Sequence, residues 1–114
     1  MRYSVCCGVL HGGVAAATAE ALMRSRYSAY VQGNADYLLH TWAVATRPLT
    51  LDISTPPQPR WLGLKVLSQR EDGESAEVEF VARFRMAGRA QVLHEVSRFQ
   101  REEWRWVYVD RRFV

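Results

Sequence analysis

The N-terminal third of the chain repeats apolar side chains at helical spacing. Members of this stripe recur at three- and four-residue steps: Ala19, Leu22, Met23, Arg26, Tyr27, Tyr30 and Val31. Thr18 is a favourable N-cap residue, and Gly33 can adopt the left-handed conformation that ends a helix. The pattern therefore predicts an amphipathic helix over residues 18–33 whose apolar face covers another element.

A second, shorter helix is predicted directly after the first. Asn34 can cap it, and Asp36 stands in its first turn, where the helix dipole favours a carboxylate. It must end before Pro48, because the residue preceding a proline disfavours helical backbone. Leu49–Ile53 alternates apolar and polar side chains and predicts a short strand, while the three prolines that follow make residues 54–60 a loop.

From Trp61 onward the apolar period changes to two, which is typical of strands. The clearest segment is Ala76–Met86, whose apolar side chains alternate with charged ones. Asp72-Gly73 is a favoured hairpin pair, and Ala87–Arg89 supplies another turn. We therefore expect strands at 61–70, 76–86, 90–101 and 104–110, joined as a twisted antiparallel meander. Two helices packed on such a strongly curved sheet make an α+β fold.

Composition supports one folded domain. Of the 114 residues, 48% are hydrophobic and 11% are aromatic, which is enough apolar material for a core. The formal charge is +3, but the arginines are scattered among acidic residues, whereas nucleic-acid binders group their cations on one face. An ion-paired strand surface is therefore favoured over a nucleic-acid partner. No stretch reaches the roughly 18 apolar residues of a membrane span, so no membrane association is expected.

The N-terminus gathers thiols and an imidazole. Cys6 and Cys7 are adjacent, and His11 follows closely. Neighbouring cysteines rarely form a disulfide without strain, which predicts reduced thiols and a cytoplasmic protein. These side chains are of the kinds that zinc prefers, but a closed structural site needs four ligands and only three stand here. An intact zinc site is therefore not predicted from these residues alone.

These N-terminal residues also carry a resemblance. The segment from Tyr3 to Tyr30 resembles the YchJ-type bacterial proteins, and its run from Thr18 to Tyr30 is very specific. The similarity continues through further motifs, among them Thr46-Arg47-Pro48, Leu93-His94-Glu95 and Trp106-x-Tyr108-Val109-Asp110. The resemblance implies a SEC-C zinc motif joined to a cone-shaped domain of the nuclear transport factor 2-like, or SnoaL-like, fold. Residues 1–13 would be the remnant of the motif and residues 14–114 the domain.

The resemblance also bears on zinc. A SEC-C motif consists of a Cys-x-Cys pair followed by Cys-Cys or Cys-His, so Cys6 and Cys7 match its second half. The first pair would lie before Met1. We therefore expect no cofactor for the chain as given, and zinc only where the missing N-terminal ligands are present, with the role of His11 left open.

The implied cone encloses a cavity, which is a natural ligand site. The candidate ligand-binding residues are Tyr27, Tyr30, Trp42, Trp61, Arg26 and Arg98. Two interpretations of Arg26 stand side by side. Its guanidinium reaches solvent at the edge of the helical stripe, or it is buried and holds a carboxylate or a ligand.

Two hypotheses about function follow. The residues favour a non-enzymatic module that binds a small molecule or a protein, with a homodimer through the sheet expected by analogy with the fold. The alternative is a small-molecule enzyme in which His94, with Glu79 or Asp110, performs acid–base chemistry in the cavity. A lone histidine more often has a structural role, and no nucleophile triad, phosphate-binding loop or metal-hydrolase motif accompanies it.

Overall fold

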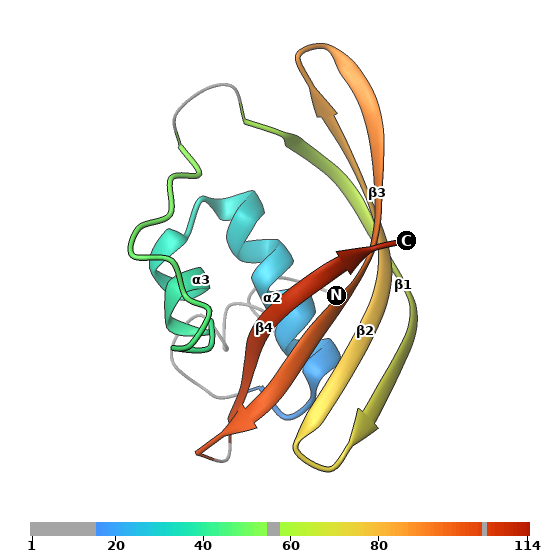
Figure 1. Cartoon of the computed structure of the whole chain (residues 1–114). Helices are drawn as coiled ribbons and strands as arrows, with labels where there is room; N and C mark the ends of the chain where they lie inside the picture. Colours follow the sequence, from blue (N-terminus) through green and yellow to red (C-terminus); the bar gives the residue numbers. More distant parts are fainter. Residues whose placement is uncertain (1–15, 55–57, 104) are drawn as a thin grey trace.

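Two helices followed by four strands make up the part of the chain that the computed structural model describes, residues 16–54, 58–103 and 105–114. The helices are α2 (Ala19–Gln32) and α3 (Ala35–His40). The strands are β1 (Arg60–Asp72), β2 (Ser75–Met86), β3 (Arg89–Glu102) and β4 (Arg105–Phe113). They form one antiparallel sheet in the order β1-β2-β3-β4, and both helices lie on the same face of it (Figure 1). The predicted α+β architecture is confirmed.

Local capping explains where the helices begin and end. The Thr18 hydroxyl accepts a hydrogen bond from the Ala21 amide at 3.0 Å, and Asn34 Oδ1 accepts one from the Tyr37 amide at 3.1 Å. Gly33 closes α2 with φ 74°, a conformation that side chains other than glycine rarely adopt. These caps are the predicted ones. Within the described residues, neither helix has the length and apolar character needed to cross a membrane.

The buried surface of α2 differs from the predicted stripe at the C-terminal end of the helix. Val31 was expected to be buried but is 51% exposed, whereas Ser25 and Ala29 are fully buried. The Ser25 hydroxyl is satisfied there, because it donates to the Leu22 carbonyl oxygen at 2.7 Å and lies 2.7 Å from the Tyr37 hydroxyl. The side of α2 that carries Ser25 and Ala29 is therefore covered by α3 and its surroundings.

Strand pairing decides which side chains of β3 face the helices. Val78 of β2 pairs with Ser97, and Phe80 pairs with Glu95. Val78 and Phe80 belong to the hydrophobic core beneath α2, so Glu95 and Ser97 share the face that the helices cover. Alternate residues such as His94 point to the opposite face, which we call the outer face. Bulges in β1 and at the β3–β4 pairing strengthen the twist of the sheet.

The chain between α3 and β1 departs from the prediction. Leu49–Ile53 forms no strand, and Leu49 is 99% exposed. Leu51 and Ile53 instead pack by their side chains on the buried cluster around Leu38. The residues directly after α3 pair with the edge of β4 instead. The Tyr108 amide donates to Thr41 O at 2.8 Å, and the Ala43 amide donates to Tyr108 O at 2.7 Å. The segment after α3 thus anchors the helical layer to the sheet.

Candidate functional site

A cavity of about 150 Å³ lies between α2 and the covered face of the sheet. Its apolar wall consists of Met23, Tyr27, Tyr30, Trp61, Leu93 and Phe99. Trp61 organises this wall: its ring centroid is 5.6 Å from that of Tyr27 and 6.1 Å from that of Tyr30. Contacts of this kind restrict ring orientation, so the wall is formed before any ligand enters. Tyr27, Tyr30 and Trp61 thus lie together, as expected for side chains lining one pocket.

The polar part of the cavity centres on Glu95. This residue is only 5% exposed, since the alternation of β3 directs it toward the helices. Among the described residues, its Oε2 atom has no hydrogen-bond partner. Arg111 Nε lies 3.6 Å from Oε2, which is an ion-pair distance but too long for a hydrogen bond. Burial raises the pKa of Glu95, and the positive charge of Arg111 partly opposes that rise.

Arg26 forms the end of the cavity nearest α3. Its Nη1 donates to Leu38 O and to Thr41 Oγ1, both at 2.7 Å. Its guanidinium carbon lies 5.0 Å from the ring centroid of Trp42 and 4.4 Å from that of Tyr108. Burial lowers the Arg26 pKa to about 10, so the guanidinium remains charged at neutral pH. Arg26 is therefore buried, and within the described residues it contacts a carbonyl, a hydroxyl and two rings rather than a carboxylate.

Trp42 does not line the cavity, although it was a candidate ligand-binding residue. It stands behind Arg26, with its ring centroid 5.0 Å from that of Tyr108. Tyr108 itself does line the cavity, and burial raises the pKa of its phenol to about 12. The hydroxyl therefore stays protonated at neutral pH and can donate or accept a hydrogen bond.

The predicted acid–base candidates lie on the outer face of the sheet. His94 Nε2 and Glu79 Oε2 are 2.7 Å apart, so the expected proximity of these two side chains is found. Their location differs from the hypothesis, because Glu79 alternates with the core residues Val78 and Phe80 and must point away from them. Each side chain of the pair is about one third exposed, 35% for His94 and 34% for Glu79. The pair does not line the cavity.

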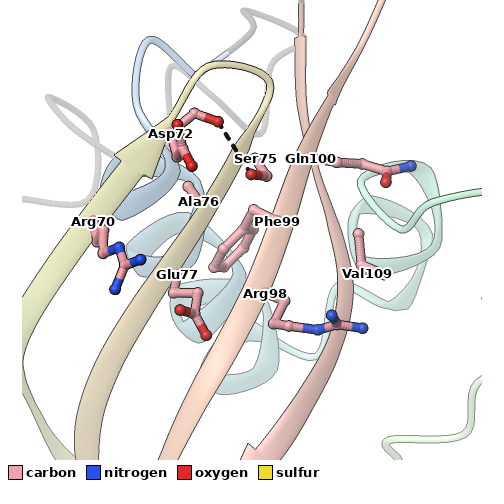
Figure 2. Close-up of a pocket in the computed structure, with 9 residues that line it drawn as sticks. All are labelled: Arg70, Asp72, Ser75, Ala76, Glu77, Arg98, Phe99, Gln100 and Val109. Carbon is pink, nitrogen blue, oxygen red and sulfur yellow. Dashed lines mark hydrogen bonds between the residues drawn. The ribbon is translucent and has the colours of Figure 1, made fainter.

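Arg98 and Asp110 also lie outside the cavity and pair with each other. Two guanidinium nitrogens of Arg98 donate to the two carboxylate oxygens of Asp110, and this pairing holds the Asp110 pKa below its usual range. Figure 2 shows Glu77 between Arg70 and Arg98 in an open groove near the β1–β2 turn. The groove is larger, about 360 Å³, but its cations and anions already alternate across neighbouring strands. Such an arrangement is typical of a solvated sheet surface.

The metal candidates Cys6, Cys7 and His11 lie outside the described residues. In residues 16–54, 58–103 and 105–114, no three His, Cys, Asp or Glu side chains come together as a metal site would require. The predicted division at residue 13 likewise falls outside the part that the structure describes. Zinc binding thus stays a prediction about the N-terminus.

Four polar residues of the cavity were not predicted from the sequence: Glu95, Ser97, Tyr108 and Arg111. One pattern could have indicated the first two. Leu93, Glu95, Ser97 and Phe99 share one phase of β3, so two polar side chains stand between two large apolar ones on the same face. Polar residues that face the same side of a strand as core residues are good candidates for side chains that line a cavity.

One protein family and several bacterial proteins are similar to this chain over most of its length. Residues 18–111 match the family model described as "YchJ, middle NTF2-like domain". The UPF0225 protein of Polaromonas naphthalenivorans is 58% identical over 112 residues, covering 96% of this chain and 81% of that protein. The UPF0225 protein of Bordetella pertussis is 54% identical over 112 residues, covering 95% of this chain and 84% of that protein.

Two solved structures share the fold. The solution structure of a SEC-C motif containing protein from Rhodopseudomonas palustris has a TM-score of 0.88 and 38% identity, covering 98% of this chain and 91% of that one. The crystal structure of a SEC-C motif containing protein from Psychrobacter arcticus has a TM-score of 0.78 and 31% identity, covering 96% and 71% of the two chains. These matches agree with the predicted nuclear transport factor 2-like architecture.

Proposed function

The chain belongs to the YchJ-like UPF0225 family, and from this premise we propose that its NTF2-like domain is a module that binds a small molecule in the cavity between α2 and the sheet. One observation carries the proposal. Glu95 lines the cavity, and its buried Oε2 atom has no hydrogen-bond donor among the described residues. A bound molecule would supply that donor.

Without a ligand, Glu95 is expected to lower the stability of the fold. A buried polar atom without a partner destabilises a protein by about 1–3 kcal/mol, and by more when it is charged. Phe80 lies opposite Glu95 on the neighbouring strand, and Leu93 is two residues away on the same face, so an apolar side chain would fit this environment. Glu95 is thus a poor choice for stability alone. A ligand that donates to Oε2 would recover the lost hydrogen bond.

The size of the cavity favours a small molecule over a protein segment. Its volume is about 150 Å³, whereas sites for drug-sized ligands span roughly 300–1,000 Å³. A single ring or a compound of similar size would fill it. A protein partner, which the sequence left open, would instead have to use the exposed surface.

The alternative of an acid–base enzyme has a weaker basis. His94, Glu79 and Asp110 lie on the outer face, and the space near Asp110 is an open groove. A catalytic histidine benefits from an enclosed site that positions substrate and excludes bulk water. The cavity between α2 and the sheet contains none of these three residues among its lining.

The proposal is tested by mapping the binding of a simple aromatic probe. Indole at millimolar concentration is titrated into the nitrogen-15-labelled chain, and amide shifts are followed by NMR. We expect the largest shifts at Tyr27, Leu93 and Ser97, and the same response in the outer-face control Glu79→Gln. Ser97→Leu places a larger side chain in the cavity and should abolish the shifts while the spectrum stays dispersed.

A second blocking variant, Leu93→Trp, guards against a folding defect in the first. Either blocking variant that remains folded decides the question. Shifts that survive in a folded blocking variant, or that centre on Arg70 and Asp72 in the outer groove, would contradict the proposal.

A further inference from the structure

We infer that the ligand is a small, uncharged, planar ring compound that presents an N–H donor beside a C=O acceptor, as a lactam does. In this arrangement the N–H donates to the Glu95 carboxyl, the carbonyl accepts from Arg111, and the ring lies among Tyr27, Tyr30 and Trp61. The inference rests on the proposed function, since it specifies the ligand of the same cavity. It has three supports: the polar atoms, the charges and the shape.

The polar atoms place an acceptor beside a donor. Glu95 lines the cavity, and its buried Oε2 atom lacks a hydrogen bond in the described part of the chain. Arg111 Nε lies 3.6 Å away, and its side chain is 52% exposed at the cavity edge. A guanidinium has five N–H donors, and the contacts recorded for Arg111 are this ion pair and the ring of Phe113. A lactam edge, with its donor next to its acceptor, complements this pair.

The charges favour a neutral ligand. The cavity lining contains two guanidiniums, Arg26 and Arg111, and one carboxyl, Glu95. A cationic ligand would enter a site whose cations outnumber its anion, and an anionic ligand would compete with Glu95 for its ion pair with Arg111. An uncharged ligand incurs neither penalty. The complementarity also survives protonation of Glu95, because a carboxylic acid still offers an acceptor beside a donor.

The shape favours a flat ring. Tyr27, Tyr30 and Trp61 form a continuous aromatic wall whose ring centroids are 5.6–6.1 Å apart. Aromatic side chains contact flat π-systems in offset or edge-to-face arrangements. The cavity volume of about 150 Å³ suits one ring and lies below the roughly 300–1,000 Å³ of sites for drug-sized ligands.

The test uses four one-ring probes on the nitrogen-15-labelled chain: 2-pyridone, N-methyl-2-pyridone, benzylamine and benzoate. 2-Pyridone is a neutral lactam, and N-methylation removes only its donor. We expect 2-pyridone to shift cavity amides such as those of Leu93 and Ser97, with the N-methyl compound at least about tenfold weaker because the acceptor is left unpaired. Benzylamine and benzoate should bind more weakly than 2-pyridone.

Variants identify the contacts. Glu95→Leu should weaken 2-pyridone binding at least about tenfold, and Arg111→Met should weaken it several-fold, because each removes one hydrogen bond. Glu79→Gln, on the outer face, should leave the affinity unchanged. Arg111 is half-exposed, so its substitution keeps the test valid if Glu95→Leu perturbs the fold.

Equal binding of 2-pyridone and its N-methyl analogue, or undiminished binding by folded Glu95→Leu, would overturn the inference. If benzylamine or benzoate occupies the cavity in preference to 2-pyridone, the ligand class is wrong while the proposed binding function stands. If none of the four probes shifts a cavity amide, both the inference and the proposed function fail.

Discussion

Arg26 Nη1 lies 2.7 Å from the carbonyl oxygen of Leu38, so a guanidinium from the middle of α2 ties down the C-terminal half of α3. The same nitrogen donates to Thr41 Oγ1, and Trp42 and Tyr108 contact the guanidinium through their rings. Arg26 thereby joins both helices to the edge of the sheet. It also fixes Tyr108, which lines the cavity.

Replacing Arg26 with methionine should destabilise the fold by about 2–4 kcal/mol, because two buried acceptors each lose a hydrogen bond and the cation–π contacts are lost. Arg26→Lys should recover only part of that loss, since an ammonium lacks the planar fork. Urea denaturation followed by circular dichroism measures both variants. The control is Arg83→Met on the exposed outer face, expected within about 0.5 kcal/mol of wild type. Equal effects at the two sites would contradict the assigned role of Arg26.

Glu95 should make stability depend on pH with a definite sign. Its folded-state pKa is raised, so the folded protein binds the proton more tightly than the unfolded chain does. The stabilisation from protonation is complete below the unfolded pKa and is lost as pH rises through the folded pKa. The charged or titratable groups that influence or share this site are Arg111, Arg26, Tyr27, Tyr30 and Tyr108.

Glu95→Leu removes that titration. Its free energy of unfolding, minus that of wild type, should therefore increase as pH rises from the usual carboxyl range to the raised pKa, and level off on either side. Urea denaturation across a pH series provides the measurement, with Glu79→Gln as the control that keeps Glu95. A difference that is independent of pH, or that decreases with pH, would show that Glu95 is not a buried carboxyl of raised pKa.

The glycine that ends α2 should be sensitive to substitution for a backbone reason alone. Gly33 has φ 74°, and a Cβ added there would meet no atom within 4 Å. Gly33→Ala should therefore cost about 1 kcal/mol through left-handed backbone strain. Gly63 in β1 is the matched control, because its Cβ would also meet open space and its φ is not positive. Thermal denaturation of the two alanine variants should separate them; equal stabilities would contradict this explanation of the cap.

The His94–Glu79 pair should contribute little to stability and nothing to cavity binding. Both side chains are about one third exposed on the outer face, and exposed ion pairs typically contribute about 0–1 kcal/mol. The free energy of unfolding of His94→Gln should thus lie within about 1 kcal/mol of the wild-type value. The variant should also bind 2-pyridone with unchanged affinity. Loss of binding in this variant, with the fold intact, would restore the hypothesis that His94 serves the site.

The sequence predicted the helix ends and hairpin turns well because these features are formed by residues close together in the chain. Thr18 and Gly33 define the ends of α2 by contacts within one helical turn, and the Asp72-Gly73 pair leads into the first hairpin turn, where Gly73 has φ 63°. The prediction of a strand at Leu49–Ile53 was wrong because pairing depends on a partner distant in sequence. The edge of β4 is taken by Trp42 and its neighbours instead.

The site was harder to predict because it depends on which phase of a strand faces the core. In β3, Leu93 and Phe99 mark the phase that carries Glu95, but Val92 and Val96 mark the other, so the strand alone does not decide which phase faces the core. The β4 contribution depends on a bulge. Tyr108 and Arg111 are three residues apart and would face opposite ways in a regular strand, but the register shift at Arg98/Phe99 brings both to the cavity.

The central claim is that a ligand occupies the cavity between α2 and the sheet. Isotope-filtered NOE measurements between unlabelled 2-pyridone and the labelled chain test it most directly, since NOEs report contacts between identified protons. The account predicts NOEs from the probe to the side chains of Tyr27, Trp61 and Leu93. NOEs to Arg70 and Gln100 in the outer groove, with none to those three residues, would contradict it.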